Sequence, residues 1–261
     1  MTPAGERAKT LSAIRDALRD LVADGVDFVP RTARSAASAG RPAAAAKPSP
    51  ASFRPRVAPL SPQTPLAEAA AAKQALLQAI RGEIGDCRRC GLCEKRRNVV
   101  FGEGSPDARI VFVGEGPGEE EDKSGRPFVG RAGELLTKMI EAMGWRREDV
   151  YICNIVKCRP PGNRDPQPVE VATCEPFLAQ QLRAIAPAAI VTLGKPAISA
   201  LLGRPVPITK LRGHWQEWQG FPVMPTYHPA YLLRNYTRET RQAVWDDLRA
   251  VRERVEESSS S

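Results

Sequence analysis

Four of the six cysteines in this chain are candidate metal ligands. Cys87 and Cys90 form a C-x-x-C pair, and Cys158 and Cys174 follow much later in the sequence. Four thiolates can hold either a [4Fe–4S] cluster or a structural zinc ion. The residues alone therefore predict a metal centre that joins distant parts of the chain, and they leave iron and zinc open.

The other two cysteines leave the ligand set open as well. Cys93 extends the first pair to C-x-x-C-x-x-C, whereas Cys153 stands in an apolar run, where a thiol behaves as a small core residue. The sequence shows neither a signal peptide nor an apolar segment of about 18–20 residues. It thus predicts a soluble cytoplasmic protein without membrane association, in which paired cysteines are more often metal ligands than disulfides.

Three loops carry further residues with chemical capacity, and each follows an apolar run that predicts a strand. The first loop is Gly114–Gly118 (GEGPG), the second begins at Asn154, and the third is Tyr227–Pro229 (YHP). Ligands of parallel α/β sheets bind beyond the carboxyl ends of the strands. The three loops are therefore expected to meet at one edge of a sheet.

The glycine loop does not fit the common nucleotide-binding motifs. A Walker A loop needs glycine directly before Lys-Ser/Thr, but Asp122 precedes Lys123 and Ser124. A dinucleotide fingerprint that starts at Gly114 needs its third glycine at position 119, which is glutamate. The glycines alone would explain a tight turn, but not the carboxylate of Glu115 inside it.

Alternating strands and helices must position these loops. Strands separated by helices imply a parallel sheet covered on both faces, which predicts a three-layer αβα sandwich with a central four-stranded parallel sheet. The strands are expected at 108–114, 150–156, 189–193 and 223–225, and the helices at 66–84, 132–143, 168–185 and 237–255, with a short helix before the last strand.

Composition divides the chain into four parts. Residues 1–29 contain an amphipathic helix, and residues 30–66, rich in Ala, Pro, Ser and Arg, predict a disordered linker. Residues 67–256 form the folded domain, and 257–261 a disordered tail. The N-terminal helix is expected to dock either on the folded domain or on a protein partner. Its apolar stripe consists of Leu11, Ile14, Leu18, Leu21 and Val22.

Three blocks of the sequence resemble the signature motifs of the family 4 uracil-DNA glycosylases. They are residues 113–133 (VGEGPGEEEDKSGRPFVGRAG), 154–165 (NIVKCRPPGNRD) and 227–235 (YHPAYLLRN), and the likeness covers about residues 80–252. The resemblance implies a uracil-DNA glycosylase-like fold. It also implies a DNA repair enzyme that flips uracil out of DNA, hydrolyses its N-glycosidic bond and leaves an abasic site for base excision repair.

The resemblance further implies which residues act. It makes Glu115 and His228 catalytic, and it places Glu121 near C5 of the base, where a carboxylate would disfavour the methyl group of thymine. The implied uracil-binding residues are Gly116, Glu121, Phe128 and Asn154. The implied ligands of a structural [4Fe–4S] cluster, which the resemblance favours over zinc, are Cys87, Cys90, Cys158 and Cys174.

The residue types fit this chemistry independently. Cleavage develops charge on the departing uracil and on the sugar, so it requires hydrogen-bond donors and a carboxylate. His228, helped by the backbone N–H of Gly116, can donate to the uracil oxygen, and Glu115 can position water and stabilise the cationic sugar. Asn154 can both donate and accept, and can thereby read uracil and reject cytosine. Phe128 offers a ring on which the base can stack.

A base inside a duplex must be flipped before it can react, so a wedge and phosphate contacts are expected. The net charge of +8 and the pI of about 9.4 suit a polyanion without identifying one. The expected partner is uracil-containing DNA, single- or double-stranded, bound by a monomer. Residues expected to fill the emptied stack are Leu232, Leu233 and Arg234, and the expected phosphate contacts are Arg126, Lys157, Arg159 and Arg164.

Two other functions remain open at this point. One is a non-catalytic, metal-bound DNA-binding or protein-interaction module, against which the presence of Glu115, Asn154 and His228 argues. The other is a glycosylase subclass that traps the abasic sugar covalently through a histidine in an inserted basic loop. Residues 125–132 contain no histidine and no insertion, which favours simple turnover.

Overall fold

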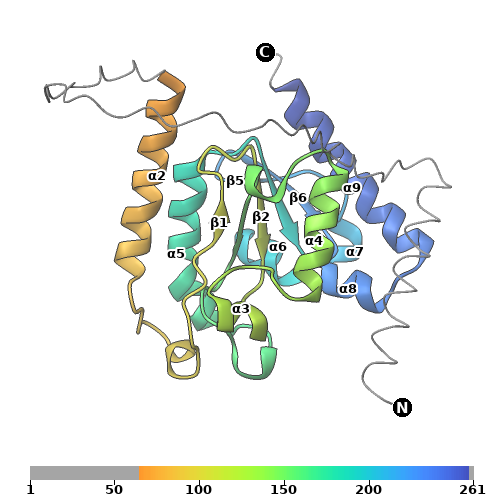
Figure 1. Ribbon diagram of the computed structural model, residues 1–261. Helices are drawn as coiled ribbons and strands as arrows, with labels where there is room; N and C mark the ends of the chain where they lie inside the picture. The colour runs from red at the N-terminus through yellow and green to blue at the C-terminus, as the bar shows by residue number, and fades with distance from the viewer. Residues whose placement is uncertain (1–64, 259–261) are drawn as a thin grey trace, which may run out of the picture. The chain divides into compact units, whose positions relative to one another are not determined.

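A mixed six-stranded sheet forms the centre of the computed structural model, which describes residues 65–258 (Figure 1). The strand order is β1-β3-β2-β4-β6-β5. Strands β3, β2, β4 and β6 run parallel to one another. The strands are β1 (Glu103–Gly104), β2 (Ile110–Gly114), β3 (Tyr151–Asn154), β4 (Ala189–Leu193), β5 (Gln216–Trp218) and β6 (Phe221–Thr226).

The predicted four-stranded parallel sheet is confirmed as the core of this sheet, but the prediction missed both edges. Strand β1 pairs antiparallel with β3, and β5 pairs antiparallel with β6. Both edge strands are too short to show a periodic pattern. A two-residue turn joins β5 to β6, and Gln219 and Gly220 both have positive φ there (49° and 84°), as hairpin turns that match the strand twist require.

Helices connect the strands and form the other layers. They are α2 (Pro65–Ile84), α3 (Glu119–Ser124), α4 (Arg131–Ala142), α5 (Pro168–Ile185), α6 (Lys195–Leu201), α7 (Ile208–Leu211), α8 (Pro229–Arg234) and α9 (Arg238–Glu257). Short 3₁₀ segments lie at Gly91–Glu94, Arg147–Asp149 and Pro161–Asn163. The four long predicted helices are all present, and α5 has the predicted bounds.

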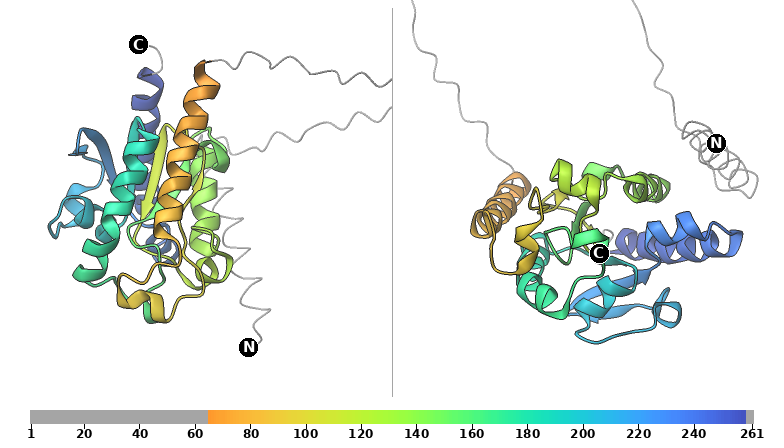
Figure 2. Two further views of the ribbon diagram at one scale, coloured as in Figure 1. Left: turned by 90° about the vertical axis from the view of Figure 1, so that its left-hand side faces the viewer. Right: turned by 90° about the horizontal axis from the view of Figure 1, so that it is seen from below.

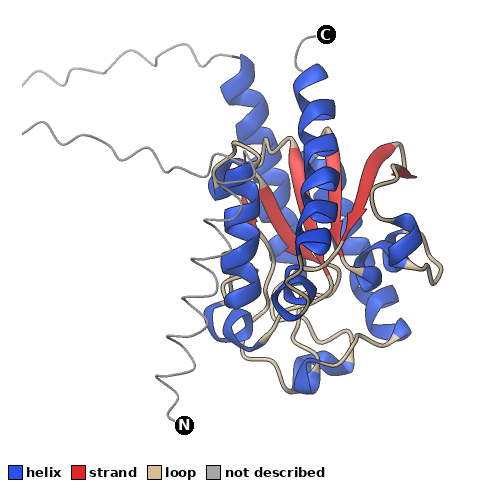
Figure 3. Ribbon diagram, turned by 90° about the vertical axis from the view of Figure 1, so that its right-hand side faces the viewer, coloured by secondary structure: helices blue, strands red, loops and turns tan. Residues whose placement is uncertain are grey.

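Alternation along the strands produces two separate cores. Val111 and Val113 of β2 pack in one cluster with residues of α2, α5 and α6. Ile110 and Phe112 point to the opposite face and pack with residues of α4 and α9. The side views show helices on both faces of the sheet, with α2 and α5 next to each other (Figures 2 and 3). The predicted three-layer arrangement is thus confirmed.

The predicted N-terminal helix and almost all of the linker lie outside the described residues, as does most of the tail. Residues 65 and 66, assigned to the linker, already belong to α2. Within the range from 65 to 258, no helix is long and apolar enough to cross a membrane.

Candidate active site and cysteine cavity

The predicted loops begin at the same edge of the sheet. Strands β2 and β3 are paired in parallel, with Gly114 opposite Asn154 at their carboxyl ends. Strand β4 pairs in parallel with the other side of β2. Its last residue, Leu193, lies opposite Thr226 at the end of β6. Because all four strands run in one direction, Glu115, Asn154 and His228 leave the sheet on the same side.

Gly114 allows the first two loops to touch. A side chain at this position would meet the ring of Phe128 at 2.5 Å, and the amide oxygen of Asn154 even closer. Glycine is therefore required here for a close approach rather than for an unusual φ angle. The aromatic ring and the amide predicted to bind uracil lie side by side over the end of β2.

The amide of Asn154 is buried without partners. The residue is 1% exposed, and among the described residues neither its amide nitrogen nor its amide oxygen finds a hydrogen-bond partner. A buried polar group that lacks a partner costs about 1–3 kcal/mol, and such groups are rare in native folds. The amide is thus prepared for a ligand that offers one acceptor and one donor.

His228 starts α8 and presents a defined tautomer. Its Nδ1 atom accepts the backbone N–H of Ala230 at 3.0 Å, so the proton of the neutral ring lies on Nε2. Burial, reinforced by the charge of Arg234, lowers the pKa of His228 to about 4, although Glu121 acts in the opposite direction. The ring centroids of His228 and Phe128 are 5.6 Å apart. A neutral imidazole donor therefore lies next to the predicted base-stacking ring.

Glu115 is held in a partly buried position directly after β2. Burial, together with the neighbouring carboxyl of Asp165, raises the pKa of Glu115 to about 7. Asp165 comes from the loop that follows Cys158, and its proximity was not predicted. A carboxyl group with a pKa near neutrality can exchange protons with water at physiological pH, which suits a general base.

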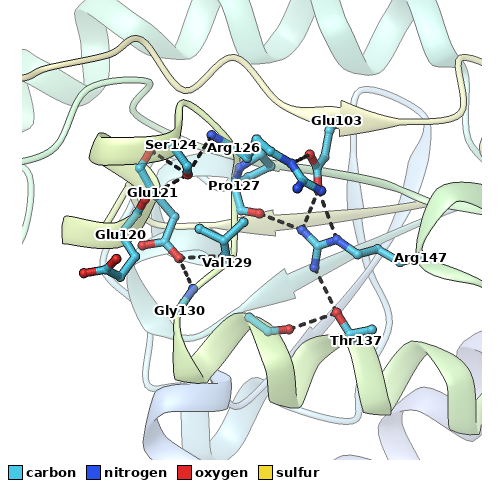
Figure 4. A network of polar contacts seen from close by, with 11 residues as sticks. Glu103, Glu120, Glu121, Ser124, Arg126, Pro127, Val129, Gly130, Thr137 and Arg147 are labelled. Atoms are coloured by element: carbon cyan, nitrogen blue, oxygen red, sulfur yellow. Dashed lines mark hydrogen bonds and ion pairs between the residues drawn. The ribbon is translucent and has the colours of Figure 1, made fainter.

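Glu121 secures the loop that carries Phe128. Its Oε1 atom accepts the backbone N–H groups of Val129 and Gly130 at 2.8 and 3.0 Å (Figure 4). Phe128 itself has a positive φ of 50°, an unusual backbone angle for a bulky residue. The predicted contact of Glu121 with the base stays a prediction, since the structure shows this carboxylate holding the backbone.

Arg147 holds the same loop from the other side. It donates to the carbonyl oxygen of Pro127 at 2.6 Å and to the hydroxyl of Thr137 at 3.0 Å. The carboxylate of Glu103 accepts from Arg147 at 2.7 Å and from Arg126 at 2.8 Å (Figure 4). Sequence reasoning missed Glu103 and Arg147, because they lie outside the motifs and meet only in the folded chain.

A second unpredicted network fixes the end of β6. Asp247 of α9 is 1% exposed and accepts the hydroxyl of Thr226 at 2.7 Å. Arg212 donates to the same carboxylate and lies over the ring of Tyr227, 5.6 Å from its centroid. Thr226 and Tyr227 directly precede His228, so this network positions the histidine loop. No local sequence signal marks Asp247, since it lies in a highly charged helix.

Two of the residues predicted to contact DNA are buried instead. Leu232 is 3% exposed and packs in the core that α4 and α9 share, so it cannot serve as the wedge. Lys157 is 1% exposed and cannot reach a phosphate. Leu233 is partly exposed and Arg234 exposed, and both remain available to DNA.

The predicted phosphate contacts Arg159 and Arg164 also serve the protein itself. Arg159 donates to the side-chain oxygen of Asn163 at 2.7 Å, and Arg164 makes two bonds, of 2.9 and 2.7 Å, to the carboxylate of Glu170. Both arginines keep part of their surface exposed. Their contact with DNA stays a prediction.

The uracil-binding role of Gly116 also stays a prediction. A side chain at this position would meet the side chain of Val156 at 2.8 Å.

The predicted metal ligands line one cavity. Its wall includes Cys87, Cys90, Cys158 and Cys174, together with apolar residues such as Leu92 and Phe177. Cys93 and Cys153 are not part of this wall, and Cys153 is buried in the core. Among residues 65–258, no three Cys, His, Asp or Glu side chains are placed to hold a single metal ion.

Hydrogen-bond donors point at the sulfurs. Arg89 donates to Cys87 Sγ at 3.5 Å, Arg96 to Cys158 Sγ at 3.5 Å, and the backbone N–H of Lys157 to Cys174 Sγ at 3.3 Å. Burial raises the pKa of the Cys158 thiol to about 12, so a bound metal must displace its proton. Four thiols that share a cavity, three of which accept a hydrogen bond and two of these from an arginine, are a suitable ligand set for a metal centre.

Comparison of the sequence with known proteins identifies relatives of this chain. Residues 101–249 match the sequence model of the uracil DNA glycosylase superfamily. A type-4 uracil-DNA glycosylase of Thermotoga maritima is 54% identical over 178 residues, which cover 67% of this chain and 93% of the relative.

Two less similar relatives are also uracil-DNA glycosylases. A type-4 uracil-DNA glycosylase of Sulfurisphaera tokodaii is 46% identical over 186 residues, covering 68% of this chain and 84% of the relative. A type-5 uracil-DNA glycosylase of Pyrobaculum aerophilum is 33% identical over 164 residues, covering 56% and 72%. The chain therefore belongs to the uracil DNA glycosylase superfamily and, within it, to the type-4 uracil-DNA glycosylases.

Proposed function

We propose that this protein flips uracil out of DNA and hydrolyses its N-glycosidic bond, leaving an abasic site for base excision repair. The observation that carries the proposal is the buried amide of Asn154, which lies beside Phe128 with its donor and acceptor both unpaired. Uracil offers an acceptor, O4, next to a donor, N3–H, and matches this amide. Cytosine offers the reverse pattern and would leave the amide unpaired.

His228 acts on the leaving group. Its Nε2–H donates to the uracil carbonyl oxygen on which negative charge develops, and the backbone N–H of Gly116 assists. The neutral ring suits this role, because a fixed donor stabilises the anion without releasing its proton. The bond from Ala230 to Nδ1 sets the tautomer before substrate binds.

Glu115 acts on the sugar and on water. As a carboxylate it stabilises the positive charge that develops on the sugar, and it orients a water molecule toward C1′. The pKa of about 7 means that the ionised form is reached near neutral pH, where it can take up a proton from that water.

The cysteine cavity is proposed to hold a [4Fe–4S] cluster through Cys87, Cys90, Cys158 and Cys174. These four thiols line one cavity, and four thiolates are the ligand set of such a cluster. The same number of thiolates would hold a structural zinc ion, and the resemblance to the family 4 enzymes favours iron. When bound, the cluster stabilises this part of the fold, and hydrolysis itself needs no electron transfer.

DNA is the proposed partner in both strand forms. The net charge of +8 attracts the phosphate backbone. The exposed Arg234 and the partly exposed Leu233 follow the catalytic histidine and are proposed to enter the gap that uracil leaves. A monomer that acts in the cytoplasm remains the expected form.

The test uses oligonucleotides that differ in a single base. The purified protein is incubated with strands that carry uracil, thymine or cytosine at one position, and then with hot alkali. We expect alkali-dependent cleavage with uracil alone. A protein–DNA adduct that survives denaturation would indicate covalent trapping of the sugar, and binding without cleavage or adduct would indicate a non-catalytic module.

A further inference from the structure

Lys157 is a buried lysine without a carboxylate partner. It is 1% exposed, and its ammonium donates to the backbone oxygen of Asn154 at 2.8 Å. In the part of the chain that the structure describes, no carboxylate pairs with it. Lysine is almost never fully buried unless its side chain has a specific partner, and here that partner is the backbone oxygen of Asn154.

The backbone of Lys157 faces the cysteine cavity. Its N–H donates to Cys174 Sγ at 3.3 Å, and Lys157 and Cys158 both belong to the cavity wall. Lys157 thus contacts Asn154 through its side chain and a sulfur of the cavity through its backbone.

The five residues 154–158 connect this cavity to the active site. Asn154 presents its amide there, the N–H of Ile155 donates to Gly114 at 2.9 Å, and the N–H of Val156 donates to the backbone oxygen of Glu115 at 3.1 Å. The next residues are Lys157 and Cys158. Over one short stretch, the chain thus supports the base-reading amide, the catalytic glutamate and the metal ligands.

We propose that Lys157 is a positioning residue that ties Asn154 to the cysteine cavity, through its side-chain bond to the backbone oxygen of Asn154 and its backbone bond to Cys174. The proposal rests on the function proposed above and on the occupation of the cavity by metal. It gives the cluster a role in aligning the uracil-reading residues, beyond its role in stability. If Lys157 only fills space, an apolar side chain of similar length would replace it.

The first test compares Lys157→Met with Lys73→Met as a matched control. Lys73 lies on α2 and pairs with Asp107, away from the active site. Three quantities are measured: hydrogen exchange of the peptides that contain residues 114–116 and 154–156, loss of visible absorbance to an iron chelator, and single-turnover excision of uracil. We expect the Lys157 variant to exchange faster in both peptides, to lose iron faster, and to excise about 100-fold more slowly.

The control is expected to match the wild type in all three measurements. Unchanged exchange and unchanged iron retention in Lys157→Met would overturn the proposal, whatever the excision rate. If the wild type itself excises no uracil, the proposed function fails, while exchange and iron retention still decide the role of Lys157.

A second pair of variants covers the case in which Lys157→Met does not fold. Lys157→Arg keeps the charge but moves the donor, and it is introduced into the wild type and into Asn154→Ala. If Lys157 acts through the amide of Asn154, the arginine slows excision in the wild type and adds little in the Asn154→Ala background. An equal loss in both backgrounds would show that Lys157 does not act through Asn154.

Discussion

The backbone N–H of Ala230 donates to Nδ1 of His228, and this bond leaves Nε2 as the nitrogen that carries the ring proton. His228→Ala removes that donor, which the proposed mechanism uses chiefly in the transition state. We expect single-turnover excision to fall by about 100- to 1,000-fold or more, with the affinity for uracil-containing DNA barely changed. The control is His214→Ala, since His214 is exposed and is the other histidine of the chain. Equal losses of rate and affinity would contradict the assigned role.

Asn154→Ala is expected to separate activity from stability. Loss of the amide should reduce excision by about 100-fold or more. The melting temperature should stay unchanged or rise, because the substitution removes a buried amide that has no partner.

Gln181→Ala is the matched control for Asn154→Ala. Gln181 is also fully buried, but its amide nitrogen donates to Phe101 and Tyr151. This variant should lower the melting temperature and leave excision intact. If both variants lowered the melting temperature alike, the amide of Asn154 would have a structural partner.

Glu115 should give excision a pH dependence with a midpoint of about 7, since its pKa is raised to that value. The ionised form is the active one, so the single-turnover rate should rise as the pH increases through the midpoint. Because the pKa of His228 is lowered to about 4, titration of His228 should not change the excision rate above about pH 5.

Asp165→Asn tests the cause of this raised pKa. Without the second carboxyl, the pKa of Glu115 should fall and the midpoint should move to lower pH, although burial still raises it. Single-turnover rates between about pH 5 and 9 give the midpoint of each variant. A midpoint that does not move would show that Asp165 does not influence the catalytic carboxyl.

The cysteine assignments predict a clear spectroscopic difference. Serine at position 87, 90, 158 or 174 should abolish or destabilise the broad absorption near about 400 nm that an iron–sulfur cluster gives to anaerobically purified protein. Cys93→Ser is the control, because Cys93 does not line the cavity. Colourless wild-type protein with bound zinc would favour the alternative metal.

Arg147→Met tests how the loop of Phe128 is held. The substitution removes the bonds to Pro127 and Glu103 and should allow the ring of Phe128 to shift, so excision should slow by about 10- to 100-fold. Arg146→Met is the matched control, since Arg146 is exposed and pairs with the nearby Asp149. Equal rates for the two variants would show that the loop does not depend on Arg147.

The sequence predicted the layers well because the core strands are continuous apolar runs and the long helices carry local end signals. Pro168 follows Gln167, whose side chain forms a capping box with Glu170, and the predicted start of α5 is correct. Strand β6 was predicted too short, because Pro222 and Pro225 interrupt its pattern. The edge strands depend on pairing with distant segments, which local sequence does not record.

The common position of the candidate site residues at the strand ends could be predicted, but which loop side chains are buried could not. Pro229 and Leu232 lie three residues apart on α8 and face the core together, which turns Leu232 away from DNA. Lys157 looked like a surface cation, and only tertiary packing reveals that it is enclosed. Asp247 contacts Thr226 and Arg212 across long separations in sequence, so no motif could signal it.

The brevity of β1 and β5 affects how copies of this protein meet in a crowded cell. A long exposed edge strand can pair with a strand of another chain, which leads to aggregates. Here the edge strands are two and three residues long, and they run antiparallel to the strands with which they pair. The repair domain therefore offers little template for intermolecular β-pairing.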